Sequence, residues 1–275
     1  MTTTTDSAAT LARLLLSCRI VDLSQVLAED LPTTWPGHMY YQHKLWNWYA
    51  PAEGFAGQKI PSKSAYHTRY LIVDEHAGTH FDAPSHFVPP PDSGLRLAGP
   101  LGSITGDKVP LEQLQGPAVV IDVRHVSSDQ NGVSPWITAQ HVRDWESDHG
   151  PLHEGEVVLL FTGWDRFFVD GAEGEKYVIR PVLRKDSPGW PAPSVDLVEY
   201  VLSRGVRCLG IDAPSIGAAH QGAPAHEAGL AHGILYVENL TNLERLPVRG
   251  SFFVFLPIKI ASSSGGPGRA FAYVA

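Results

Sequence analysis

His76-Ala77-Gly78-Thr79-His80-Phe81-Asp82-Ala83-Pro84-Ser85-His86 is the stretch in which this chain concentrates its chemistry. It holds three of the thirteen histidines and one aspartate. Imidazole and carboxylate groups are the side chains that bind ions such as Zn, Mn and Fe. The glycine and the proline within the stretch disfavour a helix and favour an extended, turning segment. Because alternate residues of an extended segment share a face, one cavity is predicted to receive four even-numbered side chains, those of His76, His80, Asp82 and His86.

A metal site explains this cluster better than a scatter of polar residues in a surface loop or a buried histidine beside an aspartate. A bound metal would also hold still a loop that carries such ligands. We predict that one divalent ion, Mn or Zn, is held by His76, His80 and Asp82. Three protein ligands leave positions for water and substrate, which is the pattern of a catalytic site.

His86 follows the predicted ligands, beyond the bend at Pro84. An imidazole with an ordinary pKa of about 6.5 can both take and give a proton near neutral pH. His86 is therefore predicted to act as the general acid/base. Its alternative role is that of a fourth metal ligand.

The whole stretch resembles the His-x-Gly-Thr-His-x-Asp-x-Pro-x-His signature of the putative cyclase family. That family includes bacterial arylformamidases (kynurenine formamidases), isatin hydrolases and trans-dienelactone hydrolases. Thr162-Gly163-Trp164 and the Gly-x-Asp-x-Pro-Ser segment at 210–215 are similar to further segments of the family, and the likeness covers residues 20 to 275. The resemblance implies an α/β fold, a single-domain, swivelling β/β/α barrel-like structure with a mixed sheet. It also implies the acid/base role of His86 and a homodimer or homotetramer.

The resemblance points to a second ion as well. In similar arylformamidases a His and a Glu twelve residues apart hold a second metal, which the motif aspartate bridges to the first. His226 and Glu238 have that separation here, and Asp82 would be the bridge. Nearby alternatives are His220, Gln221 and His232. The isatin hydrolase branch is similar but uses one ion, so one ion is expected and a second is possible.

Two tryptophans are candidates for substrate binding. Trp35 lies in an aromatic-rich loop expected over 31–49, and in similar proteins this loop helps line the substrate pocket, sometimes across a subunit contact. Trp164 follows the strand expected over 157–161, and strand ends commonly carry binding groups. Ordinary core packing is the alternative for both rings.

Composition indicates a globular chain and excludes some partners. Of the 275 residues, 43% are hydrophobic, which is enough for a full hydrophobic core. We expect an N-terminal tail and short helix over residues 1–19, followed by one domain over residues 20–275. The formal net charge of -8 argues against nucleic acid and anionic membranes as partners. Cys18 and Cys208 are expected to be unpaired buried thiols of a cytoplasmic protein. No transmembrane span or signal peptide is predicted.

Alternating patterns predict strands and helices along the chain. Residues 1–6 are expected to be disordered, helices are expected over 7–18, 138–148, 194–204 and 225–232, and strands over 20–23, 70–73, 119–123, 157–161, 206–211, 234–237, 251–260 and 270–274. This alternation is typical of a single α/β domain.

We therefore expect a hydrolase that uses a metal and water to cleave a carbon–nitrogen bond in an amide. The aromatic loop favours a flat substrate, a cyclic amide such as isatin or an aryl formamide such as N-formylkynurenine. The alternatives are a lactone hydrolase of the dienelactone type, a polyketide-type cyclase, and a metal- or ligand-binding protein without turnover.

Overall fold

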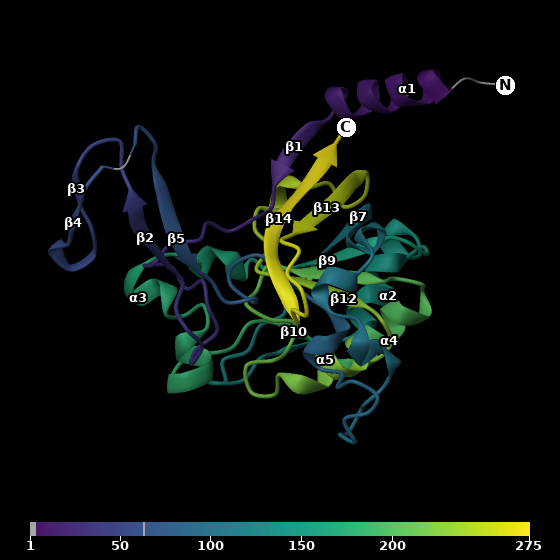
Figure 1. Ribbon diagram of the computed structural model, residues 1–275. Coiled ribbons are helices and arrows are strands. Elements are labelled where there is room, and N and C mark those ends of the chain that lie inside the picture. The colour runs from purple at the N-terminus through teal and green to yellow at the C-terminus, as the bar shows by residue number, and fades with distance from the viewer. Residues whose placement is uncertain (1–3, 63) are drawn as a thin grey trace.

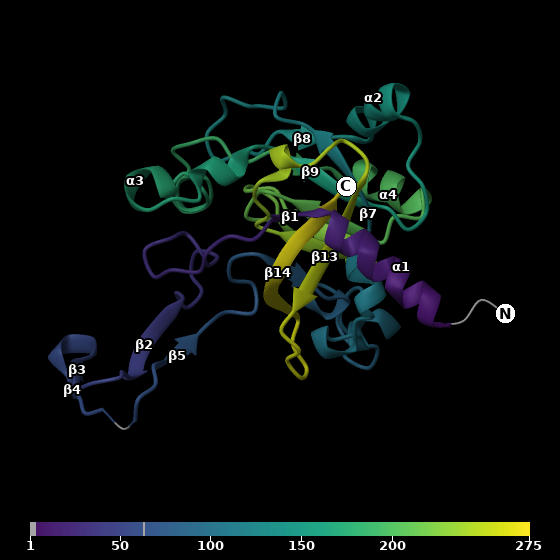
Figure 2. The same ribbon diagram turned by 90° about the horizontal axis from the view of Figure 1, so that it is seen from above.

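The computed structural model describes residues 4–62 and 64–275, and its centre is a mixed β-sheet that closes into a barrel (Figures 1 and 2). Around the barrel the strands follow the order β14, β13, β7, β9, β11, β12 and β6, and β6 pairs again with β14. β1 extends the sheet beside β14. The bounds are β1 Arg19–Asp22, β6 His80–Asp82, β7 Gln115–Asp122, β9 Val157–Phe161, β11 Cys208–Ile211, β12 Leu235–Glu238, β13 Ser251–Pro257 and β14 Gly265–Val274. The predicted barrel-like α/β fold is confirmed.

The parallel part of the sheet is connected through helices. β7, β9, β11 and β12 are parallel neighbours, whereas β6, β13, β14 and β1 pair in antiparallel fashion. Parallel neighbours require crossover connections, which here contain α2 Ala139–His149, α4 Val195–Ser203 and α5 Ala223–Leu230. All three helices were predicted within a few residues, and Thr138 caps α2 as expected.

Alternate residues of the barrel strands enter two different cores. Leu235 and Val237 of β12 pack with Phe81 of β6 and with alternate residues of β9 and β13 in the barrel interior. Tyr236, between them on β12, joins the second core, which the helices cover from outside. Because successive side chains of a strand point to opposite faces, Glu238 shares the outer face with Tyr236. His80 and Asp82 likewise lie on the side opposite Phe81.

The N-terminal part of the chain departs from the predictions. α1, Thr4–Ser17, begins before the expected residue 7, and the expected disorder of residues 1–3 lies outside the described residues. The helix extends away from the barrel (Figure 1), and its Leu11 and Leu14 side chains are exposed. The loop expected over 31–49 is wrong for Gln42–Asn47, which forms β2. This strand pairs with β5, Thr68–Ile72, a distant segment that local pattern does not reveal.

Shorter elements lie between and beside those of the barrel, among them one π-helical turn, Arg180–Arg184. The β2–β5 hairpin projects from the body and carries two small strands at its tip, β3 Ala52–Glu53 and β4 Lys59–Ile60. β8 Trp136–Ile137 pairs with β10 Ala192–Pro193, and α3 spans Gly171–Gly174. Short 3-10 turns cover Pro84–His86, Pro100–Ser103, Gly106–Lys108, Leu111–Leu114, Trp164–Phe167 and Leu243–Arg245.

The cysteine prediction is partly corrected. Cys18 and Cys208 are both free, but only Cys208 is buried, and burial raises the pKa of its thiol to about 12. Cys18 follows the projecting α1 helix and is only partly covered. Among the helices of residues 4–62 and 64–275, none combines the length and apolar character needed to cross a membrane.

Candidate metal centre

A tight turn after β5 places His76 above β6. The Asp74 carboxylate accepts a hydrogen bond from the His76 backbone N–H at 2.8 Å, and the Ala77 N–H donates to the Asp74 carbonyl at 3.2 Å. Gly78 completes the turn with a φ of 58°, a left-handed conformation that glycine adopts readily. A Cβ at Gly78 would lie 2.5 Å from Leu27 Cδ2, so the close packing of Leu27 also requires a residue without a side chain at this position.

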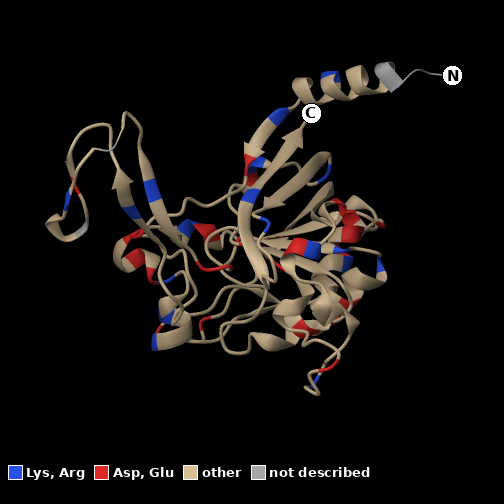
Figure 3. Cartoon of the chain, viewed as in Figure 1, with Lys and Arg blue, Asp and Glu red and all other residues tan. Residues whose placement is uncertain are grey.

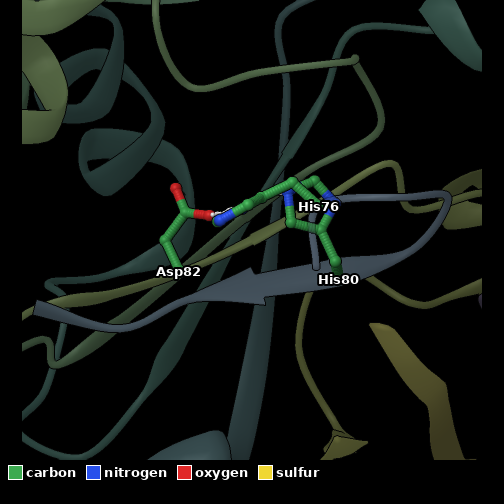
Figure 4. A group of neighbouring side chains, drawn as sticks. All are labelled: His76, His80 and Asp82. Carbon is green, nitrogen blue, oxygen red and sulfur yellow. Dashed lines mark hydrogen bonds and ion pairs between the residues drawn. The ribbon is translucent and has the colours of Figure 1, made fainter. Parts of the chain in front are cut away.

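The strand β6 supplies two further side chains to the same point. Figure 4 shows His76, His80 and Asp82 converging above the strand, as their even numbering predicted. His76 Nδ1 lies 2.9 Å from Asp82 Oδ1, and His80 Nε2 lies 3.6 Å from the same oxygen. Ligand atoms of these residues are all within 4.8 Å of one another.

His226 and Glu238 join this cluster from α5 and β12. Glu238 is paired with His80 in the β12–β6 register, and its Oε2 lies 3.4 Å from His80 Nε2. His226 Nε2 lies 3.3 Å from Asp82 Oδ2 and 3.2 Å from Glu238 Oε1. Asp82, His226 and Glu238 thus form a second group of possible metal ligands, next to the first. The two groups share Asp82.

The donor atoms fit divalent metal ions. His80 and His226 each donate their Nδ1–H to a backbone carbonyl at 2.8 Å, that of Gly78 and that of Gly222. These bonds leave both Nε2 lone pairs facing carboxylate oxygens. Asp82 Oδ2 is buried and makes no hydrogen bond, although it lies close to His226. Lone pairs facing buried carboxylates are costly unless a cation or a proton lies between them. Imidazole nitrogen and carboxylate oxygen together suit Zn and Mn.

Without a metal, protons compensate the buried carboxylates. Burial alone would lower the pKa of His226, but Asp82 and Glu238 raise it to about 10. Burial alone would raise the pKa of Asp82, but nearby histidines, His86 and His226 foremost, hold it well below its ordinary value. The cluster is therefore a buried anionic site that attracts a positive charge.

His86 lies beside the cluster at the end of the 3-10 turn Pro84–His86. Its ring stacks on that of His76, with centroids 4.0 Å apart and planes inclined by 27°. Burial lowers the pKa of His86 to about 4, although the Asp82 carboxylate opposes this shift. The ordinary pKa assumed from sequence is thereby corrected, and the ring is neutral at pH 7.

The cluster opens into a cavity of about 270 Å³. Trp35, one of the two candidates for substrate binding, lines it and packs edge-on against Trp190 at 6.1 Å. Trp164 is not among the lining residues; it is buried and its Nε1 donates to the Tyr177 carbonyl. The aromatic wall is completed instead by Phe87, which stacks on His226 at 4.5 Å.

Asn239 is a site residue that sequence reasoning missed. Its Nδ2 lies 3.4 Å from His80 Nδ1, and its Oδ1 accepts a hydrogen bond from the Tyr177 hydroxyl at 2.7 Å. The residue has a φ of 57°, and its carbonyl accepts from the Thr79 hydroxyl of the motif. Two features of the sequence could have indicated this residue: it directly follows Glu238, and asparagine tolerates left-handed conformations. The other candidates, His220, Gln221 and His232, do not line the cavity.

Two of the family-like segments are joined by a buried contact of Asp212, which does not line the cavity, although Pro214 and Ser215 of the second segment do. The Asp212 carboxylate accepts hydrogen bonds from the backbone N–H groups of Thr162 and Gly163, at 2.8 and 2.7 Å. Burial raises the pKa of Asp212 to about 7, while these hydrogen bonds act in the opposite direction. The contact joins the ends of β9 and β11, so its role is to support the sheet edge next to the site.

Comparison with known proteins agrees with this fold. Residues 21–218 match the family described as Putative cyclase, and the chain belongs to that family. It is 31% identical over 214 residues to an isatin hydrolase of Roseibium aggregatum, covering 74% of each chain. It is 27% identical over 254 residues to a kynurenine formamidase of Erythrobacter litoralis, covering 92% of each.

Solved structures of relatives cover nearly the whole chain. An isatin hydrolase bound to the product analogue thioisatinate has a TM-score of 0.79 at 25% identity over 99% of both chains. Isatin hydrolase A from Ralstonia solanacearum has a TM-score of 0.76 at 28% identity, covering 100% of this chain and 98% of that one. The relatives named here are thus isatin hydrolases and a kynurenine formamidase.

Proposed function

We propose that this protein is a metal-dependent hydrolase that cleaves the carbon–nitrogen bond of an aromatic or cyclic amide, with water as the nucleophile. One observation carries the proposal: Asp82 and Glu238 each direct one oxygen toward His80 and the other toward His226. This buried set of ligands opens into a cavity whose wall contains the neutral imidazole of His86. The names of the relatives, isatin hydrolase and kynurenine formamidase, support the same chemistry.

The two groups of side chains indicate which residues would hold each metal ion. One ion, Mn or Zn, would be held by His76, His80 and Asp82, with Glu238 close enough to contribute. A second would be held by Asp82, His226 and Glu238. When bound, such a metal lowers the pKa of water and polarises a carbonyl oxygen.

His86 supplies the proton transfers of the proposed reaction. Because its ring is neutral at pH 7, it can accept the proton that the attacking water loses. The same imidazole then gives that proton to the leaving nitrogen, so it returns to its starting state. The stacking on His76 holds the ring at the edge of the group of predicted metal ligands, where the reacting carbonyl would lie.

The cavity favours a flat, uncharged substrate. Trp35 and Phe87 provide aromatic faces, and no lysine or arginine is among the described residues that line the cavity. A buried carboxylate without a cationic partner is costly, which disfavours the zwitterionic amino acid N-formylkynurenine. A cyclic amide such as isatin has no such charge. A neutral lactone fits the same wall and is the second candidate substrate.

The test is a substrate panel with metal-stripped protein reloaded with Mn or Zn. We expect hydrolysis of isatin to exceed that of N-formylkynurenine and of a dienelactone. The His86→Gln variant should bind the metal and lose turnover. Stoichiometric metal without turnover of any of the three substrates would support the binding-protein alternative and reject the enzyme. Faster cleavage of the dienelactone would select the lactone alternative.

We also propose that the protein forms a homodimer or homotetramer in the cytoplasm. Apolar side chains are exposed on the projecting elements, among them Leu14 of α1 and Leu71 of β5. Residues 42–72 of the hairpin contain four basic residues and one acidic residue, whereas the whole chain has a net charge of -8 (Figure 3). The hairpin is thus complementary in charge to the body of a second copy. Light scattering should show an oligomer that Leu71→Asp dissociates; a monomeric wild type would reject this proposal.

A further inference from the structure

A hydroxyl and a carboxylate lie behind His76, at the ring nitrogen that does not face Asp82. His76 Nε2 lies 3.0 Å from Ser264 Oγ. The Ser264 hydroxyl in turn lies 2.7 Å from Glu75 Oε2, which also accepts the Ser264 backbone N–H at 2.7 Å. Glu75 and Ser264 are far apart in the sequence, and neither belongs to the ligand groups described above.

The order of these contacts determines where the protons lie. Ser264 has one hydroxyl proton, and Glu75 is an acceptor without a proton of its own when ionised. A charge-assisted hydrogen bond to the carboxylate is stronger than a neutral one to an imidazole nitrogen, so the hydroxyl donates to Glu75. Its oxygen then accepts a proton from His76 Nε2. This tautomer leaves the lone pair of His76 on Nδ1, the atom that lies 2.9 Å from Asp82 Oδ1.

The backbone holds Ser264 in place for this contact. Its carbonyl accepts the N–H of Ala83, and Gly265 pairs with Asp82 at the start of β14. The same register brings the β14 backbone against the ring, because a Cβ at Gly265 would lie 2.8 Å from His76 Cε1. The strand pairing that closes the barrel therefore also sets the distance between Ser264 and His76.

We propose that Glu75 and Ser264 are positioning residues, which hold His76 in the tautomer that presents Nδ1 to a metal ion. The inference rests on the proposed function only in requiring that the cluster binds a metal. Hydrogen bonds to the second nitrogen of a histidine ligand orient its ring and raise its basicity. His80 and His226 receive that support from backbone carbonyls, which substitution does not remove. For His76 the support comes from side chains, so mutation can test it.

The experiment measures Zn²⁺ affinity of the metal-stripped, full-length protein by competition with a fluorescent chelator. Ser264→Ala should weaken binding by about 10- to 100-fold. Glu75→Gln should weaken it less, because an amide oxygen still accepts both Ser264 bonds but carries no charge. Ser262→Ala is the matched control: its side chain is exposed two residues away, and its affinity should equal that of wild type.

A second readout is a crystal structure of the Zn²⁺-loaded protein, in which His76 should bind the ion through Nδ1 and donate Nε2–H to Ser264. Coordination through Nε2, or wild-type affinity in both Ser264→Ala and Glu75→Gln, would overturn the proposal. Wild-type protein that binds no Zn²⁺ would overturn it together with the metal site. If Zn²⁺ affinity responds as expected but no amide is hydrolysed, the proposed function fails and the positioning role stands.

Discussion

Asp82 and Glu238 both lie between His80 and His226, and each directs a different oxygen toward each imidazole. The two carboxylates come from neighbouring strands, because β6 and β12 pair with His80 opposite Glu238. Oxygens of the two carboxylates lie within 4.8 Å of one another, and two buried anions at this distance repel one another unless a positive charge lies near them. The arrangement therefore predicts how metal content should respond to substitution.

Asp82→Asn should abolish metal binding, because Asp82 is the residue common to both ligand groups. His226→Gln removes a ligand of the second group alone, so this variant should keep one ion per chain. Elemental analysis of protein dialysed after loading with Mn or Zn measures both. Stoichiometric metal in Asp82→Asn would contradict the assignment of the ligands.

His86→Gln should lower kcat by about 10²- to 10⁴-fold, the range that general acid/base catalysis contributes. Its metal content should equal that of wild type, because His86 is in neither ligand group. The measurement combines steady-state kinetics with elemental analysis. His153→Gln, at an exposed position, is the control and should leave both unchanged. Loss of the ion in His86→Gln would instead make His86 a ligand.

Zn²⁺ binding at pH 8 should release a proton from His226. In the metal-free protein two carboxylates raise the pKa of this imidazole from 6.5 to about 10, so it is protonated, and a metal must displace that proton. Calorimetry in buffers of different ionisation enthalpy counts the protons released. Wild type should release about one more than His226→Gln. Equal release by the two proteins would show that His226 loses no proton when the metal binds.

The same pKa shift predicts a pH dependence of stability. The folded pKa of His226 is higher than the unfolded value, so the stabilisation from its protonated form is complete below pH 6.5 and is lost as the pH rises through about 10. The free energy of unfolding of the metal-free protein should fall over this interval. Urea unfolding at several pH values measures it, and His226→Gln should show a shallower decline.

Gly265→Ala should destabilise the protein and weaken metal binding. The added Cβ would lie 2.3 Å from the Phe81 carbonyl oxygen and 2.8 Å from His76 Cε1, so the strand or the ligand must shift. We expect a loss of about 1–3 kcal/mol in the free energy of unfolding. Gly266→Ala is the matched control, because its nearest contact would be 3.2 Å and does not involve His76. Equal stability and metal affinity of the two variants would refute this account.

Trp35→Ala should raise KM for an aromatic substrate on the order of 10-fold, with a smaller effect on kcat, because the ring contributes stacking rather than proton transfer. Steady-state kinetics on isatin measures both. Trp136→Ala is the control, because this partly exposed ring lies against His220 and does not line the cavity. An unchanged KM in Trp35→Ala would place the substrate elsewhere.

The sequence by itself identified the elements and residues whose signals are local. Helical and strand periodicity predicted α2, α4 and β9 closely, because each follows from residues that are neighbours in the chain. The spacing of His76, His80 and Asp82 predicted a shared cavity, and the structure brings the three together. Their binding of metal stays a prediction.

The tertiary structure decided which distant residues contact His76, His80 and Asp82. The β6–β12 pairing brings Glu238 to His80, α5 adds His226, and the start of β14 places Ser264 behind His76. It also put Phe87 rather than Trp164 in the cavity wall and made residues 42–47 a strand. The physical reason is that these contacts join segments distant in the chain, which no local pattern relates. The closure of the barrel and the packing of its covering helices bring the site residues together, and the separate pairing with β5 makes residues 42–47 a strand.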